Sequence, residues 1–148
     1  MAHERYQAKY KSADEIRRGG AIGNLQEGPV IDTHGVPTRL IAWAGNGYQA
    51  EAVHVLTLHP GEESRPYTYG QAEEAMLCLG GTGEVYLRGA WRQIQPGDMP
   101  YFPEGVAHAV RNPSSNKDDL FVVTQITPAP FDLYEPAGYY HRGQGTFN

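Results

Sequence analysis

The stretch that decides the fold is Gly97–Asn112, which reads GDMPYFPEGVAHAVRN. Its fixed points are separated by five, two and three residues, and they are Gly97, Pro103-Glu104-Gly105, His108 and Asn112. Short apolar runs lie on either side of the Pro-Glu-Gly turn, and each has the length and composition of a β-strand. The stretch therefore predicts two short strands joined by a turn, with a histidine at a defined place on the second.

A segment upstream has a comparable regularity. It reads GEESRPYTYGQAEEAMLCLGG from Gly61 to Gly81 and holds two tyrosines, Tyr67 and Tyr69, followed by Glu74. Side chains two residues apart on a strand point to the same face. We therefore expect both tyrosines to face the same side, which the fold predicted below makes the interior.

Short apolar runs separated by turn residues continue on both sides of these segments. Eighteen glycines and eleven prolines in 148 residues are typical of an all-β chain, and many short antiparallel strands indicate a sandwich or barrel. Ser12 and Glu15 have the spacing of a capping box, so residues 13–18 are predicted to form one short helix that Gly19-Gly20 ends. The predicted strands are 39–43, 51–58, 74–79, 84–88, 91–94, 99–102, 107–111 and 119–127.

Charge and composition exclude several classes of partner. The net charge is −5 with twelve Lys and Arg, which argues against binding to nucleic acid or to an anionic membrane surface. The chain starts without an apolar signal segment and has no window of about 20 apolar residues, so a cytoplasmic location is expected. Cys78 is the single cysteine and predicts neither an internal disulfide nor a thiolate metal cluster.

On the residues of these two segments, the chain resembles the cupin superfamily, in its single-domain form with the conserved cupin 2 barrel. The resemblance covers roughly residues 39–127 and implies a cupin jelly-roll β-barrel, also called a double-stranded β-helix. Residues 1–38 would form an N-terminal arm with the short helix, and 128–148 an aromatic C-terminal tail. The resemblance also implies a small-molecule ligand and a homodimer, with the tail packed on the barrel or on a neighbouring subunit.

The resemblance further implies a metal site inside the barrel. Such proteins use two histidines and a carboxylate from the first segment and one histidine from the second. Tyrosines stand here at both first-segment histidine positions. Glu73 fits a shorter spacing of the same motif, but Glu74 is preferred because it aligns Gly81 and Gly83 with the glycine-rich turn. Carried over by position, the set is Tyr67, Tyr69, Glu74 and His108.

The tyrosines change the expected metal chemistry. A phenol has a pKa of about 10 and must lose its proton to bind a metal well, so two phenols would weaken a zinc, nickel or manganese site. Tyrosinate is a good ligand for ferric iron, and an imidazole from His54, in the predicted strand 51–58, or from His59 would complete a set. The predicted cofactor is therefore a divalent or ferric ion (iron, nickel, zinc or manganese), or none.

Tyr67, Tyr69 and His108 are also the candidate catalytic residues, as proton donors or acceptors. The alternative is structural: the tyrosines fill the interior, and His108 pairs with Glu74, since a buried carboxylate needs a partner. Four arginines are candidates for pairing with an anionic substrate, and they are Arg39, Arg88, Arg92 and Arg111.

Two classes of function follow from these residues. The first is a small-molecule cupin enzyme with a degenerate metal site, acting on a polar or anionic metabolite as a dioxygenase, isomerase, decarboxylase or lyase. The alternative is a metal-free cupin that binds or senses a small ligand, or a metal-independent proton-transfer isomerase.

Overall fold

A computed structural model describes residues 13–48, 50–134, 140–141 and 146–147. One α-helix, two 3-10 helices and eleven short strands make up the described chain. In chain order the elements are α2 (Ala13–Gly19), β1 (Val30–Thr33), β2 (Val36–Ala42), η1 (Ala44–Asn46), β3 (Ala52–Leu58), β4 (Glu73–Gly80), β5 (Gly83–Leu87), β6 (Ala90–Ile94), β7 (Tyr101–Phe102), β8 (Ala109–Arg111), β9 (Leu120–Thr127), η2 (Phe131–Leu133), β10 (Tyr140–His141) and β11 (Thr146–Phe147).

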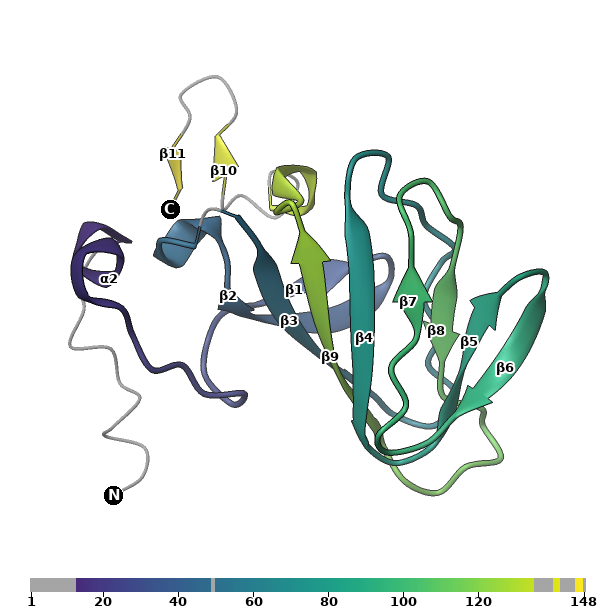
Figure 1. The fold of residues 1–148 in the computed structure, drawn as a ribbon. Coiled ribbons are helices and arrows are strands. Elements are labelled where there is room, and N and C mark those ends of the chain that lie inside the picture. Colours follow the sequence, from purple (N-terminus) through teal and green to yellow (C-terminus); the bar gives the residue numbers. More distant parts are fainter. Residues whose placement is uncertain (1–12, 49, 135–139, 142–145, 148) are drawn as a thin grey trace.

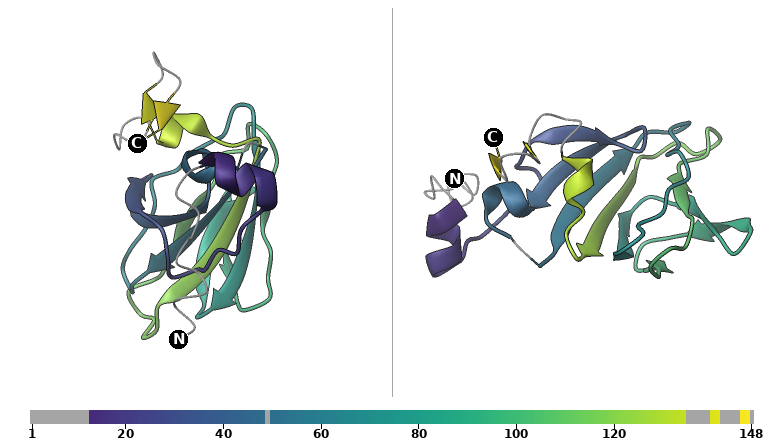
Figure 2. Two further views of the ribbon diagram at one scale, coloured as in Figure 1. Left: turned by 90° about the vertical axis from the view of Figure 1, so that its left-hand side faces the viewer. Right: turned by 90° about the horizontal axis from the view of Figure 1, so that it is seen from above.

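The strands form two main antiparallel sheets. The larger has the order β1-β2-β3-β9-β4-β7 and the smaller β6-β5-β8, while β10 and β11 pair separately. Figures 1 and 2 show α2 beyond η1, on the side of the molecule away from β5 and β6. This arrangement is the predicted all-β jelly-roll barrel with one short helix. No helix among the described residues is long and apolar enough to cross a membrane.

Period-two burial along the strands builds the core between the two sheets. In β9 the burial alternates from Leu120 to Ile126, so every second side chain faces inward. The larger sheet contributes side chains from β3, β4 and β9, and the smaller sheet contributes Val85, Ile94 and Val110. Cys78 is buried in this cluster and packs as a small apolar residue.

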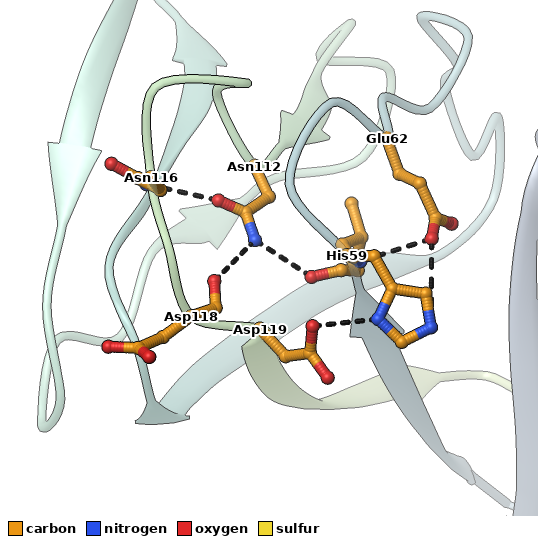
Figure 3. A network of polar contacts seen from close by, with 7 residues as sticks. His59, Glu62, Asn112, Asn116, Asp118 and Asp119 are labelled. Carbon is orange, nitrogen blue, oxygen red and sulfur yellow. Dashed lines mark hydrogen bonds and ion pairs between the residues drawn. The ribbon is translucent and has the colours of Figure 1, made fainter.

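The glycines of the two sequence segments are needed where the chain turns. Gly81 has φ +71°, and a Cβ there would lie 2.1 Å from the carbonyl oxygen of Asp119. The β5–β6 hairpin turns at Arg88 and Gly89, both with positive φ, as a two-residue turn requires. Asn112, the last fixed point of the sequence pattern, donates to the carbonyls of Leu58 and Asp118 and ties the adjoining loops together (Figure 3).

The observed strands differ from the predicted ones mainly at the start of the barrel. Strand β1 was not predicted, and β2 starts at Val36 rather than at residue 39. The hairpin between them turns at His34-Gly35, both with positive φ. Pro37 and the polar outward side chains interrupt the apolar run here. A prediction based on runs of apolar residues therefore missed β1 and the start of β2.

Candidate functional site

Glu74 lies inside the barrel because of its place on β4. Burial alternates along this strand: the exposed fraction of Glu74 is 1%, whereas its neighbour Glu73 is exposed and accepts a hydrogen bond from Tyr101. Strand β4 pairs with β9 on one side and with β7 on the other, so its inward side chains face the centre of the barrel. Of the two adjacent glutamates, Glu74 is the one in the interior.

His108 is held against Glu74 by backbone and ring contacts. Its N–H and C=O form a two-way bridge with the backbone of Tyr67, at 3.0 and 2.9 Å. Its ring stacks on Phe102, with centroids 3.9 Å apart and planes 9° from parallel. Nδ1 lies 2.8 Å from the carbonyl oxygen of Val106, and Nε2 lies 2.6 Å from Oε1 of Glu74.

These contacts define where the protons of the pair lie. A carbonyl oxygen can only accept, so the bond to Val106 requires a proton on Nδ1 of His108. The contact between Nε2 and Oε1 of Glu74 then needs one more proton, on either atom. The pair is therefore either an imidazolium with a carboxylate or a neutral imidazole with a carboxylic acid. The two forms hold the same number of protons and differ only in whether the shared proton is on Nε2 or on Oε1.

Two hydroxyl groups complete the surroundings of the carboxyl group. Tyr67 donates to Oε1 of Glu74 at 3.0 Å, and Thr124 donates to Oε2. Both oxygens of the buried carboxyl group thus have side-chain partners, which offsets the cost of burial. The sequence-based expectation that an inward Glu74 would be paired with His108 is confirmed.

Tyr69 contacts His34, a residue that the sequence analysis did not identify. Its hydroxyl lies 3.2 Å from Nε2 of His34, in the β1–β2 turn. The ring of His34 stacks on Tyr67, with centroids 3.7 Å apart and planes 4° from parallel. His34 has φ +58°, which is uncommon for a residue other than glycine, and its carbonyl accepts from the backbone N–H of Arg65 at 2.7 Å. No spacing pattern connects His34 to the motif segments, so only the fold reveals it.

The ionisation of these rings follows from their burial. Burial, and after it the charge of Glu74, raise the pKa of Tyr67 and Tyr69 well above the ordinary value of about 10. Burial also lowers the pKa of His34 to about 4, against the opposing charge of Glu74. At neutral pH both phenols therefore keep their protons, and His34 is uncharged.

His54 lies inside the barrel and contacts Tyr134. It faces Thr124 across the β3–β9 ladder, and its Nε2 is 2.9 Å from the hydroxyl of Tyr134. Tyr134 is fully buried and its ring packs on Trp43, with centroids 5.0 Å apart. The expectation that the aromatic tail packs on the barrel is met at Tyr134; the remainder of the tail lies largely outside the described residues.

Burial of His54 makes stability depend on pH. It lowers the pKa of His54 from 6.5 to about 4, so the unfolded chain binds this proton at a higher pH than the folded one does. Stability must then fall as pH drops from 6.5 to 4, by about 3 kcal/mol from this group. Urea unfolding across this range should show a smaller loss for His54→Gln than for the unchanged protein.

His59→Gln is the matched control for this comparison. His59 is exposed, and its hydrogen bond to Asp119 raises its pKa. Its contribution to stability therefore changes with pH in the direction opposite to that of His54: it is fully present below pH 6.5 and is lost as the pH rises. The loss of stability at low pH should persist in this variant. Identical pH dependence of His54→Gln and the unchanged protein would contradict the assignment to His54.

Several candidates from the sequence lie away from the barrel interior. His59 is at the surface with Glu62 and Asp119, in the polar network of Figure 3. Arg111 pairs with Glu84 at 2.9 Å and lies over the ring of Trp91. Arg39 and Arg92 donate to the backbone carbonyls of Gly28 and Leu87, and Arg88 is exposed in the β5–β6 turn.

The donors around Glu74 do not fit a metal ion as they are arranged. Two ligands of one ion, each about 2.0–2.2 Å from it, lie roughly 3 Å or more apart, but Nε2 of His108 and Oε1 of Glu74 are 2.6 Å apart. The phenols that replace the expected imidazoles keep their protons. In the described part of the chain, no three His, Cys, Asp or Glu side chains gather as a metal site would need.

Comparisons with known proteins agree with this fold. The Cupin domain family model matches residues 54–124, which include both sequence segments. An uncharacterized protein of Aquifex aeolicus is 30% identical over 67 residues, or 45% of this chain. The match spans about half of that relative's length, 52%.

Solved structures with the same fold include three from different bacteria. KdgF from Halomonas has 19% sequence identity and a TM-score of 0.64, covering 76% of this chain and 97% of that one. An RmlC-like cupin from Shewanella frigidimarina has 15% identity and a TM-score of 0.60, over 72% and 89%. Ectoine synthase from P. lautus has 21% identity and a TM-score of 0.58, over 72% and 75%. At these identities the likeness is one of fold.

Proposed function

Because this chain belongs to the cupin superfamily, we propose that it is a small-molecule enzyme that transfers protons in its barrel without a metal ion. The observation that carries the proposal is the environment of Glu74. Both carboxyl oxygens are bonded by His108, Tyr67 and Thr124. These bonds use the groups that would otherwise bind a metal, which supports chemistry that needs no metal ion.

The chemistry available to such a site is general acid–base catalysis. One group accepts a proton from the substrate while another returns one to a different atom, as an isomerase requires. His34 and Tyr69 are half-buried, whereas Glu74 and His108 are each only 1% exposed. We therefore assign contact with the substrate to His34 and Tyr69. The role of Glu74, His108 and Tyr67 is to position these rings and to set their electrostatic surroundings.

The second candidate function is a cupin that binds or senses a small ligand without transforming it. The near-complete burial of Glu74 and His108 favours this reading, because a closed, fully bonded network resembles structural polar packing. The two functions differ in turnover. Transfer of solvent deuterium into a bound ligand would support the enzyme, and binding without exchange would support the sensor.

Metal content is the direct test of the proposal. Tag-free protein should contain no stoichiometric iron, nickel, zinc or manganese by elemental analysis, and it should bind none tightly on titration. The double variant Tyr67→His, Tyr69→His should gain affinity for nickel or zinc, because neutral imidazoles replace phenols that keep their protons. Stoichiometric metal that is lost on chelation from the unchanged protein would overturn the proposal.

The homodimer and the cytoplasmic location stay predictions, as does the class of metabolite. The polar, half-buried edge of the site supports a small polar ligand. The four arginines considered from the sequence contact other parts of the protein or solvent, which gives an anionic substrate less support than a neutral one.

A further inference from the structure

A pocket of about 620 Å³ opens beside His34 and Tyr69. Its volume lies in the range that binds small molecules. One wall is the loop from Thr68 to Ala72, which directly precedes β4. The other wall is the segment from Pro128 to Leu133. The described lining therefore combines polar groups, among them the carboxylate of Asp132, with small apolar surfaces. Two of its members, His34 and Tyr69, belong to the aromatic rings beside Glu74.

The pair formed by His34 and Tyr69 is the polar centre of this lining. Their 3.2 Å contact is longer than most hydrogen bonds made by a hydroxyl, so it is easily exchanged for bonds to a ligand. A ligand hydroxyl can donate and accept at once, and it can therefore satisfy the imidazole and the phenol in either histidine tautomer. Thr68 and Gln71 add further uncharged donors and acceptors.

We propose that this pocket binds an uncharged, hydroxyl-bearing molecule and that His34 and Tyr69 hold one of its hydroxyl groups. The inference rests on the proposed function and adds the ligand class and its contacts. Ala72, Ala129 and Leu133 provide surfaces for the C–H groups of such a ligand.

The charges around the pocket disfavour an anionic ligand. No Lys or Arg belongs to the described lining, which includes the carboxylate of Asp132. Arg65 lies beside Gly35 in the His34 turn, but it is exposed and is not a lining residue.

The test uses three probes of similar size and different charge: D-glucose, D-glucuronate and D-glucose 6-phosphate. Each is titrated into the full chain while the ring signals of His34 are followed by NMR. We expect D-glucose to shift these signals in a saturable way, and each anionic probe to bind at least ~10-fold more weakly, a difference of about 1.4 kcal/mol.

Variants connect binding to the proposed contacts. Tyr69→Phe should weaken D-glucose binding about 5- to 10-fold, the effect of one lost hydrogen bond. His34→Asn should weaken it similarly and keeps a residue that tolerates the turn's positive φ. Tyr101→Phe removes a hydroxyl that bonds Glu73 outside the pocket, and Arg65→Gln removes the cation of the turn. Both should leave D-glucose binding unchanged.

Three other outcomes would contradict the ligand class, the place of binding or the pocket itself. Equal or tighter binding of an anionic probe, abolished by Arg65→Gln, would overturn the neutral ligand class but leave the metal-free site standing. A D-glucose response that Tyr69→Phe does not change would place binding elsewhere. No response at His34 to any probe would overturn the pocket assignment, whereas the metal analysis decides the proposed function separately.

Discussion

Replacing Glu74 with alanine should lower the free energy of unfolding by about 3–5 kcal/mol, the usual cost of removing one partner from a buried charged network. Glu74 is 1% exposed, and its carboxyl group is hydrogen-bonded to His108, Tyr67 and Thr124. Alanine leaves all three groups without this partner and opens a cavity in the barrel. Urea denaturation followed by circular dichroism and by fluorescence measures the change.

Two further variants separate the network from general effects of substitution. Glu74→Gln keeps the shape and an acceptor for Thr124, so its cost should be about 1–2 kcal/mol. Glu73→Ala removes the neighbouring carboxylate, which is exposed and bonds Tyr101, and should change stability by less than about 0.5 kcal/mol. Similar losses in Glu73→Ala and Glu74→Ala would contradict an inward Glu74.

Replacing Tyr134 with alanine should cost a comparable amount, about 3–5 kcal/mol, as for other large buried aromatic residues. Its side chain is fully buried, packs on Trp43 and bonds Nε2 of His54. It directly follows the segment 128–133 that forms one wall of the pocket. The variant should therefore also weaken binding of a ligand in that pocket, and a titration with D-glucose would measure this.

The contributions of the Tyr134 hydrogen bond and of its ring packing to stability can be measured separately. Tyr134→Phe keeps the packing on Trp43 and loses the bond to His54, for a cost of about 1 kcal/mol. In a double-mutant cycle with His54→Gln, the two changes should not add, with a coupling of about 0.5–1 kcal/mol. Additive effects would mean that the contact between His54 and Tyr134 contributes nothing to stability.

The spacing of glycines, prolines and short apolar runs predicted an all-β sandwich or barrel, and the resemblance to cupins specified the jelly-roll barrel. The predicted strands 119–127 and 51–58 are β9 and β3, each with one residue less at its start. Predicting the strands from their composition failed for β1 and the first part of β2, where outward polar residues and Pro37 interrupt the pattern. β1 is held by pairing with β2, and β2 in turn pairs with β3 in the larger sheet, which is a tertiary effect.

By itself, the sequence indicated the alternation of inward and outward side chains, which is a local property of a strand. The barrel and the pairing of Glu74 with His108 came from the resemblance of both motif segments to cupins. The sequence did not bring His34 to Tyr69 or Tyr134 to His54, because His34 and Tyr134 stand outside both segments and no pattern connects them to partners 35 and 80 residues away. Only the folded sheets place them together. The same burial that brings them together keeps the phenols protonated and the two histidines neutral, so the tertiary structure decided the chemical character of the site.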